Sequence, residues 1–376
     1  MALSDSEGST GARGSGETRR SGETRRSGES MGSGESRGSG ETRRSGETTG
    51  STETRGVVRL ATIGTSSITR SLVDAVGLTD GIRVTTVFSR DEARGRDFAS
   101  SLGVDRVVTD LDELLADPDV DAVYVASPNS VHTEQALAAV RAGKHVLVEK
   151  PAVTAATEWA SLRAEARERG VVVLEAMRTE YDPGLEVVRE VIGSLGTIRR
   201  VRLSYEKRSS RYDQVLAGER VNIFDPALAG GALFDLGVYC IHALVALFGE
   251  PERVQASSVT IASGTDGAGT ALCTYPGFVA EVCWSKITTS TLPSEVQGEL
   301  GTLLIDSIAS PSSLTVQRLD GTSTTRALPP LCHTLYDEVA RFVELVRGKD
   351  DATYDQDLTA ATLRVIDEIR RVSVSS

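Results

Sequence analysis

From Val57 onward, short runs of β-branched residues alternate with amphipathic stretches of helical length. This alternation is typical of parallel strands joined by helical crossovers, with helices covering both faces of the sheet. It predicts a doubly wound, Rossmann-type α/β domain over residues 57–177. The expected strands are Val58–Ile63, Arg83–Phe88, Arg106–Val108, Ala122–Ala126, His145–Val148 and Val171–Glu175. The expected helices are Ile68–Val76, Glu92–Leu102, Leu111–Ala116, Val131–Ala142 and Ala156–Arg169.

After Met177 the pattern changes, because several strands follow one another without helices between them. Turns such as Pro276-Gly277 and Asp320-Gly321 separate these strands, which favours antiparallel pairing. The sequence therefore predicts an α+β domain over residues 178–376 with an open-faced, mostly antiparallel sheet. Its expected strands are Ile198–Glu206, Arg253–Ile261, Thr270–Tyr275, Phe278–Ile287, Glu295–Leu300, Leu303–Ser307 and Leu314–Leu319. Its expected helices are Pro183–Ile192, Val238–Phe248, Thr334–Val346 and Leu358–Arg371.

Residues 1–56 have a different character. A six-residue unit of the type SGETRR recurs from Ser15 to Gly56, and Met31 is the one apolar residue in it. A segment with so little to bury cannot offset the entropy lost on ordering. We expect residues 1–56 to form a disordered tail whose removal leaves stability and activity unchanged.

The charge and the cysteines narrow the class of protein. The formal net charge of -12 disfavours binding to nucleic acid or to an anionic membrane. Cys240, Cys273, Cys283 and Cys332 form no CxxC pair and are expected to be reduced core residues. No run of about 18 apolar residues occurs, and the four histidines show no metal-ligand spacing, so a cytoplasmic protein without a metal is expected.

The first expected strand runs directly into a glycine turn. A dinucleotide site calls for GxGxxG at this point, so that backbone N–H groups at a helix start approach the pyrophosphate. Only the first glycine is present, since Ser66 and Thr69 occupy the second and third glycine positions. The location after the first strand still predicts phosphate binding. The residues expected to contact the cofactor here are Gly64, Thr65, Ser66, Ser67 and Ile68.

Ser89 and Arg90 follow the second expected strand. An acidic residue at this position would bind the ribose 2'-hydroxyl of NAD, whereas a hydroxyl and a guanidinium suit the 2'-phosphate of NADP. Asp91 could instead turn toward the ribose. The sequence favours NADP and leaves NAD possible.

Ser127, Pro128 and Asn129 end the fourth expected strand, at the sheet edge where ligands of such folds bind. They are expected to border the cofactor. The same residues also begin the next helix, in which His132 is expected to stand beside the cofactor in a structural role.

Two further motifs carry the chemistry. Glu149 and Lys150 precede Pro151 at the end of the fifth expected strand, where proline favours an extended backbone. Asp235 and Tyr239 follow a Gly-Gly turn and are four residues apart, which would place them on one helix face. A lysine and a tyrosine in a crevice suit proton transfer from a substrate hydroxyl.

With these two motifs the chain resembles, from about Val57 to its C-terminus, the glucose-fructose oxidoreductase and inositol 2-dehydrogenase family (Gfo/Idh/MocA). Tyr239 in the D-x-G-x-Y pattern resembles the branch that contains NADP-dependent aldose (D-xylose) 1-dehydrogenase and dihydrodiol dehydrogenase. The resemblance implies that Lys150, Tyr239 and Asp235 are catalytic and that Glu149 and Lys150 lie at the cofactor. It also implies that Arg178, Tyr181, Lys207 and Arg208, with Arg211 and Tyr212, flank the substrate.

These features predict an NADP-dependent oxidoreductase that acts on a hydroxyl of a small polyol or sugar, with an aldose at C1 as the first expectation. Two alternatives are a trans-1,2-dihydrodiol dehydrogenase and a cofactor-binding regulator without turnover. On the expected strand after Pro276, Phe278, Ala280, Val282 and Trp284 share one face, and the mixed opposite face needs a cover. A homodimer or homotetramer is therefore expected.

Overall fold

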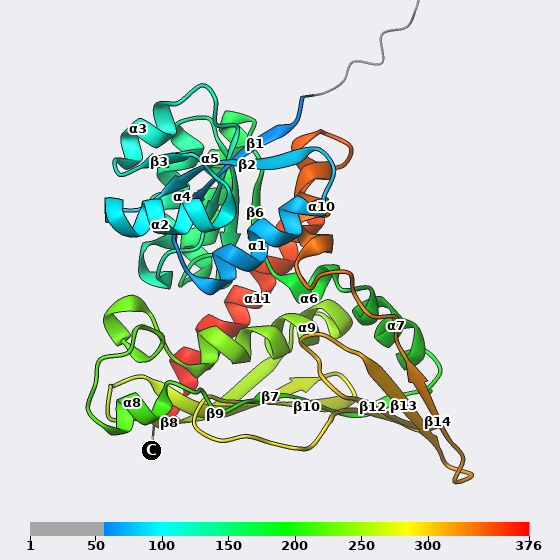
Figure 1. The fold of residues 1–376 in the computed structure, drawn as a ribbon. Coiled ribbons are helices and arrows are strands. Elements are labelled where there is room, and N and C mark those ends of the chain that lie inside the picture. Colours follow the sequence, from blue (N-terminus) through cyan, green and yellow to red (C-terminus); the bar gives the residue numbers. More distant parts are fainter. Residues whose placement is uncertain (1–55, 376) are drawn as a thin grey trace, which may run out of the picture. The chain divides into compact units, whose positions relative to one another are not determined.

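The computed structural model describes residues 56–375, and side chains are described up to residue 373. The prediction of a disordered tail over residues 1–56 therefore lies outside the described residues, apart from Gly56. The described residues form one compact unit. That unit contains a six-stranded sheet, here called sheet A, and a nine-stranded sheet, called sheet B (Figure 1).

Sheet A is parallel throughout and confirms the predicted doubly wound domain. Its strands lie in the order β3-β2-β1-β4-β5-β6. The strands are β1 (Val58–Ile63), β2 (Ile82–Phe88), β3 (Arg106–Val108), β4 (Ala122–Val125), β5 (His145–Glu149) and β6 (Val173–Ala176). The helices between them are α1 (Ser67–Gly77), α2 (Glu92–Leu102), α3 (Leu111–Ala116), α4 (His132–Arg141) and α5 (Ala156–Arg169), with a 3-10 turn η1 (Asn129–Val131) before α4.

Alternate residues of the central strands enter two different cores. In β4, Val123 and Val125 pack in the core that contains Trp159 of α5, whereas Tyr124 packs in the core that contains Leu72 of α1. Both faces of sheet A are therefore covered. This explains why its strands are almost wholly apolar.

Sheet B is mostly antiparallel and lies in the order β14-β13-β12-β11-β7-β10-β9-β8-β15. Its strands are β7 (Ile198–Glu206), β8 (Arg253–Thr260), β9 (Asp266–Tyr275), β10 (Phe278–Ser285), β11 (Ser294–Gly298), β12 (Gly301–Ile305), β13 (Ser313–Arg318), β14 (Ser323–Ala327) and β15 (Val374–Ser375). Two pairs, β7 with β10 and β8 with β15, are parallel. As predicted, Ala280, Val282 and Trp284 are buried on one face, while Val279 on the other face is exposed.

Helices α6 (Arg178–Tyr181), α7 (Pro183–Ile192), α8 (Tyr212–Leu216), α9 (Val238–Phe248), α10 (Tyr336–Val346) and α11 (Thr353–Val372) complete the described chain. The 3-10 turns η2 (Asn222–Phe224) and η3 (Pro226–Leu228) and a π-helical turn η4 (Leu233–Gly237) precede α9. Helix α9 is buried along most of its length. The stretch Pro226–Phe248 is long and apolar enough to span a membrane, but most of it is buried in the core, as in core helices of many globular proteins.

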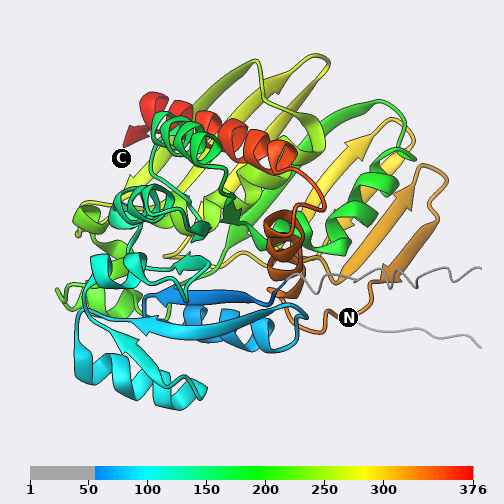
Figure 2. The same ribbon diagram turned by 90° about the horizontal axis from the view of Figure 1, so that it is seen from above.

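The two last helices return to sheet A. Val339 and Phe342 of α10 share a core with Tyr124 and Leu72, on the face of sheet A that α1 covers. Helix α11 packs against α5 and β6 of the first domain and against α9 and β8 of the second (Figures 1 and 2). The C-terminal segment therefore joins the two sheets, and the domain boundary at residue 177 stays a prediction.

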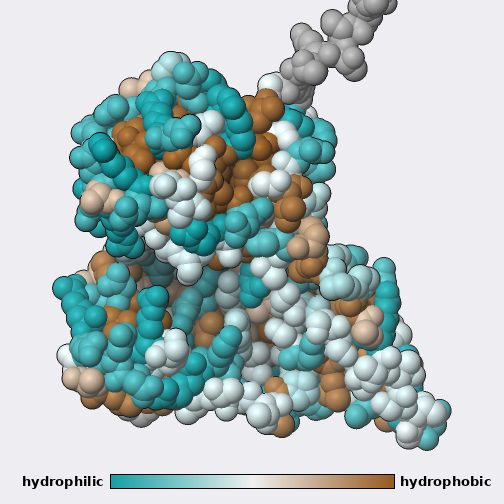
Figure 3. Space-filling view, viewed as in Figure 1, coloured by the Kyte–Doolittle hydropathy of each residue, from teal (hydrophilic) through white to brown (hydrophobic). Residues whose placement is uncertain are grey.

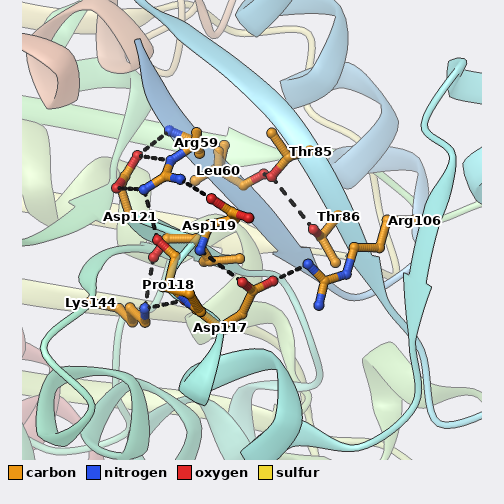
Figure 4. A network of polar contacts seen from close by, with 11 residues as sticks. Arg59, Leu60, Thr85, Thr86, Arg106, Asp117, Pro118, Asp119, Asp121 and Lys144 are labelled. Carbon is orange, nitrogen blue, oxygen red and sulfur yellow. Dashed lines mark hydrogen bonds and ion pairs between the residues drawn. The ribbon is translucent and has the colours of Figure 1, made fainter. Parts of the chain in front are cut away.

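A polar network fixes the segment that leads into β4 (Figure 4). The guanidinium of Arg59 contacts both Asp119 and Asp121, and its Nη2 donates to Asp121 Oδ1 at 2.7 Å. Lys144 Nζ donates to the backbone oxygens of Asp117 and Val120 at 2.6 and 2.8 Å. These contacts lie at the amino end of β4, opposite the edge where ligands of this fold bind, so we assign them a structural role.

Several elements were not expected from the sequence, among them β14, α6, α8 and β15. β14 was missed because its residues are exposed and polar and show no alternation, and α6 and α8 are too short to display helical periodicity. The four cysteines are free, and Cys332 is exposed, so the expectation that all four lie in the core was wrong for that residue.

Candidate active site

The strand order of sheet A reverses between β1 and β4, and the carboxyl ends of these two strands form the ligand-binding edge of such a fold. Gly64 follows β1 with a φ of +123°, in the region that favours glycine. A Cβ on this residue would lie 2.5 Å from the backbone oxygen of Ala126, which follows β4. Glycine is therefore required at this position, and the chain can turn closely at the edge where a dinucleotide would lie.

The start of α1 is open to an anion. The N-cap residue Ser66 makes no side-chain capping bond, and the first turn of α1 contains no acidic residue. Ser66 Oγ instead lies 3.2 Å from Oγ1 of Thr69, which is buried. Ser66 and Thr69 thus bond to each other at the two missing glycine positions. The helix N-terminus remains suited to a pyrophosphate, so these residues fit a dinucleotide.

The loop after β2 contains Arg90 and Asp91, the two residues that could bind the cofactor ribose, and they differ in their contacts. Ser89 Oγ donates to the backbone oxygen of Asp91 at 2.7 Å, and the Asp91 side chain accepts from Arg94 N at 3.0 Å as the N-cap of α2. Asp91 is thus engaged as a cap. Arg90 is exposed, and we find no ion-pair partner for it among the described residues.

The loop Ser127–Asn129 connects the two domains. Asn129 Nδ2 donates to the backbone oxygen of Ala229 at 2.9 Å. His132 is buried, with Nδ1 at 2.9 Å from the oxygen of Pro151 and Nε2 at 2.8 Å from the oxygen of Ser127. Burial lowers the pKa of the imidazole. His132 thereby ties the loop after β4 to the segment after β5, where Lys150 is followed by a cis peptide bond to Pro151.

Lys150 reaches from the end of β5 to the π-helical turn η4. Its Nζ donates to Asp235 Oδ1 at 2.9 Å and to the Asp235 backbone oxygen at 2.8 Å. Burial alone would lower the pKa of this ammonium, but the Asp235 carboxylate raises it overall. Two residues 85 positions apart in the chain are thereby held together.

Tyr239 lies in the first turn of α9, beside these two residues. Lys150 Nζ is 4.7 Å from the centroid of its ring, and Arg178 Cζ is 5.2 Å from it. The ring of Tyr205 is 5.7 Å away. The sequence predicted that Lys150, Asp235 and Tyr239 act together, and the structure brings the three side chains into one cluster. Their catalytic roles stay a prediction.

A second lysine that the sequence analysis did not select completes the cluster. Lys286, the residue after β10, binds Asp235 Oδ2 with its Nζ. Burial alone would raise the pKa of Asp235, but Lys150 and Lys286 hold it well below its usual range. The signal was present in the sequence, because Lys286 continues the buried alternation of Ala280, Val282 and Trp284.

Buried carboxyl groups lie behind the cluster. Glu149 accepts a hydrogen bond from the Tyr124 hydroxyl at 2.5 Å, and burial raises its pKa. Glu338 of α10 is 1% exposed, and neither of its carboxyl oxygens has a hydrogen-bond partner among the described residues. Burial, reinforced by the charge of Glu149, raises the pKa of Glu338 well above its usual range.

The predicted substrate residues separate into two groups. Arg178 lies at the Tyr239 ring. The Tyr181 hydroxyl donates to Asp355 at 3.0 Å instead, and Lys207 is exposed. Arg208 is exposed and paired with Asp213, and its guanidinium lies 5.2 Å from the ring of Tyr212. Of these residues, only Arg178 contacts the cluster.

The surface is indented between the parts formed by the two sheets (Figure 3). Among residues 56–375, no group of three or more His, Cys, Asp or Glu side chains is arranged to hold a metal ion.

Comparison with known proteins identifies the family. Residues 58–177 match the sequence model of the Gfo/Idh/MocA oxidoreductase family, NAD-binding Rossmann fold, and residues 186–304 match that of the Gfo/Idh/MocA C-terminal domain. The chain belongs to this family. It is an oxidoreductase with a nicotinamide dinucleotide-binding domain, as its sequence predicted.

Relatives of known name cover most of the described chain. The scyllo-inositol 2-dehydrogenase (NADP(+)) IolU of Bacillus subtilis is 37% identical over 319 residues, which cover 84% of this chain and 97% of that protein. The trans-1,2-dihydrobenzene-1,2-diol dehydrogenase of Bos taurus is 33% identical over 255 residues, covering 66% of this chain and 72% of that protein. KijD10, a 3-ketoreductase from Actinomadura kijaniata solved with NADP and TDP-benzene, has a TM-score of 0.78 and 26% identity, covering 85% of this chain and 98% of that one.

Proposed function

We propose that this protein is an NADP-dependent dehydrogenase that oxidises a ring hydroxyl of a small cyclic polyol, with scyllo-inositol as the first substrate to test. The observation that carries the proposal is the cluster of Lys150, Asp235 and Tyr239, which has the groups needed to move a hydroxyl proton. The 37% identity to an NADP(+)-dependent scyllo-inositol 2-dehydrogenase over nearly its whole length supports the substrate class.

In the proposed mechanism the Tyr239 phenol oxygen takes the proton of the substrate hydroxyl as general base. Lys150, whose Nζ lies 4.7 Å from the centroid of the Tyr239 ring, polarises the oxygen of that substrate hydroxyl. Asp235 fixes the Lys150 ammonium through two hydrogen bonds. A bound nicotinamide would supply the acceptor for the hydride from the carbon that carries this hydroxyl.

The residues after β2 support NADP over NAD. The Asp91 carboxylate caps α2, and exposed Arg90 has no carboxylate partner among the described residues. A guanidinium suits a 2'-phosphate. The relative from Bacillus subtilis is named for NADP(+).

An aldose oxidised at C1 is the second candidate. It is favoured by Tyr239, since the D-x-G-x-Y pattern resembles the branch that contains aldose dehydrogenases. A dihydrodiol of an aromatic ring is disfavoured, because the side chains around Tyr239 include the charged groups Lys150, Arg178 and Asp235. A regulator without turnover is disfavoured because both Lys150 and Tyr239 are present.

The experiment is a panel of inositols, aldoses and trans-dihydrodiols with NADP and with NAD, followed by absorbance of the reduced cofactor. Oxidation of scyllo-inositol with NADP supports the proposal, and exclusive oxidation of aldoses replaces it by the second candidate. Absence of turnover together with NADP binding would instead favour a regulator.

We further propose a homodimer or homotetramer in the cytoplasm. One face of sheet B exposes Val259, Leu272 and Val279, and a second copy would cover these apolar side chains. Light scattering in high salt should give at least twice the chain mass. A clean monomer would refute the assembly.

A further inference from the structure

Lys286 is held rigidly at the end of β10. Its backbone N–H donates to the oxygen of Gly267 at 2.8 Å, and its backbone oxygen accepts from Ser209 at 2.8 Å. By alternation its side chain follows buried Trp284 toward the covered face of sheet B. The direction of this lysine is therefore set by the sheet.

The Lys286 ammonium has more N–H donors than hydrogen-bond acceptors around it. Its side chain is 8% exposed, and its only hydrogen-bond acceptor among the described residues is Asp235 Oδ2. An ammonium carries three N–H donors, and a buried donor without a partner is costly. The ring of Phe224, 5.9 Å from Nζ, offers a cation–π contact but no acceptor of comparable strength.

The cluster also contains two lysines for the single negative charge of Asp235. Lys150 alone would neutralise this carboxylate, yet Lys286 occupies its second oxygen. The Asp235 side chain remains 35% exposed, so a ligand can reach this carboxylate, whereas Lys150 and Lys286 are 12% and 8% exposed. The two ammonium groups bind different oxygens of one carboxylate, an arrangement that suits a ligand with two neighbouring oxygens.

We propose that Lys286 determines substrate specificity by binding the hydroxyl on the carbon next to the one that is oxidised. Lys286 donates to that hydroxyl and Asp235 accepts from it, while Lys150 and Tyr239 hold the reacting hydroxyl. The substrate is therefore a vicinal diol, and a simple ring alcohol is a poor ligand. This inference rests on the proposed function, since it presumes that Lys150 and Tyr239 mark the reacting hydroxyl.

Binding of trans-cyclohexane-1,2-diol and of cyclohexanol to the NADP complex, followed by NMR titration, tests the proposal. The two ligands differ by one neighbouring hydroxyl, and the measurement needs no turnover. The wild type should bind the diol about tenfold or more tightly than the alcohol, the effect of a hydrogen bond to a charged group. In Lys286→Met the two affinities should agree within about twofold, because the donor is gone.

Lys286→Arg should retain part of the preference, and Lys349→Met, which removes an exposed lysine, should retain all of it. With the substrate that the wild type oxidises, Lys286→Met should raise KM more than it lowers kcat. If Lys286→Met does not fold, Lys286→Gln replaces it in the same titration, with a weaker preference than the wild type.

A diol preference unchanged in Lys286→Met, or absent from the wild type, overturns the inference. Failure of the proposed function gives a different result. In that case the wild type oxidises no polyol in the panel, although it binds NADP.

Discussion

Asp235 and Glu338 are two carboxyl groups in opposite electrostatic states, and they differ in exposure, since the Asp235 side chain is 35% exposed whereas Glu338 is buried. Asp235 lies between Lys150 and Lys286, which hold its pKa well below the usual range despite burial. Glu338 has no hydrogen-bond partner among the described residues, and burial raises its pKa well above the usual range. The electrostatic state of each carboxyl group therefore follows from its burial and from the cations around it together.

The difference has consequences for stability against pH. The lowered pKa of Asp235 contributes stability that is present above about pH 4 and is lost as pH falls through the folded-state pKa. The raised pKa of Lys150 contributes stability that is present below about pH 10 and is lost as pH rises through the folded-state pKa. The contribution of the ionic cluster to the free energy of unfolding should thus be constant between about pH 5 and 9. The contribution of Glu338 is most favourable below about pH 4 and becomes progressively less favourable as pH rises.

The largest effect is expected where the Asp235 cluster meets Tyr239. Tyr239→Phe should lower turnover by about a hundredfold or more with near-normal NADP binding, because the general base is lost. Steady-state kinetics and fluorescence titration measure the two quantities. Tyr205→Phe is the matched control, since its ring lies 5.7 Å away and its hydroxyl has no assigned role. Normal turnover in Tyr239→Phe would exclude the proposed base.

Removing the negative charge of Asp235 tests directly whether the two lysines depend on this carboxylate. Asp235→Asn leaves Lys150 and Lys286 side by side without a carboxylate, so we expect a loss of about 2 kcal/mol in unfolding free energy, allowing for partial exposure. Chemical denaturation at pH 7 measures it. Asp213→Asn, at an exposed pair with Arg208, should cost clearly less, because solvent screens that pair. Equal losses in the two variants would contradict a special role for the cluster.

Arg90 differs from Lys150 and Lys286, because it has no carboxylate partner among the described residues. Arg90→Ala should weaken NADP binding by about 1.5–3 kcal/mol and leave NAD binding nearly unchanged, because a charge-assisted bond to the 2'-phosphate is lost. Fluorescence titration with both cofactors measures this. Arg96→Ala, which removes an exposed guanidinium paired with Glu92, is the control. Equal weakening for both cofactors would mean that Arg90 does not bind the phosphate.

The smallest effect is expected at Glu338. Glu338→Gln should change turnover by less than about twofold and stabilise the protein by about 1 kcal/mol at pH 8, since the cost of an ionised buried carboxyl is removed. Between pH 5 and 8 the melting temperature of Glu338→Gln should fall less steeply than that of the wild type. Glu344→Gln, at an exposed position of the same helix, should leave the pH dependence unchanged. A steeper decline in Glu338→Gln would show that Glu338 has a partner when charged.

Some features of the fold can be predicted from residues near in sequence, and others cannot. The period of two in Phe278–Ser285 and the apolar strands of sheet A predicted two sheets of different kinds, because side-chain alternation is local. The parallel pairing of β7 with β10 was not predicted, since strand order depends on contacts distant in sequence. The cluster was predicted as far as Lys150, Asp235 and Tyr239, through a motif resemblance.

The sequence by itself thus determined the fold class, and it predicted the cofactor role of the glycine turn and the pair of motifs that suit proton transfer. Only the tertiary structure decided which charges meet. Lys286 and Asp235 are 51 residues apart, and Glu338 lies on a helix that returns to sheet A from the far end of the chain. Helical and strand periodicity states which face a residue occupies, but the electrostatic state of a buried group depends on partners that folding brings from distant segments.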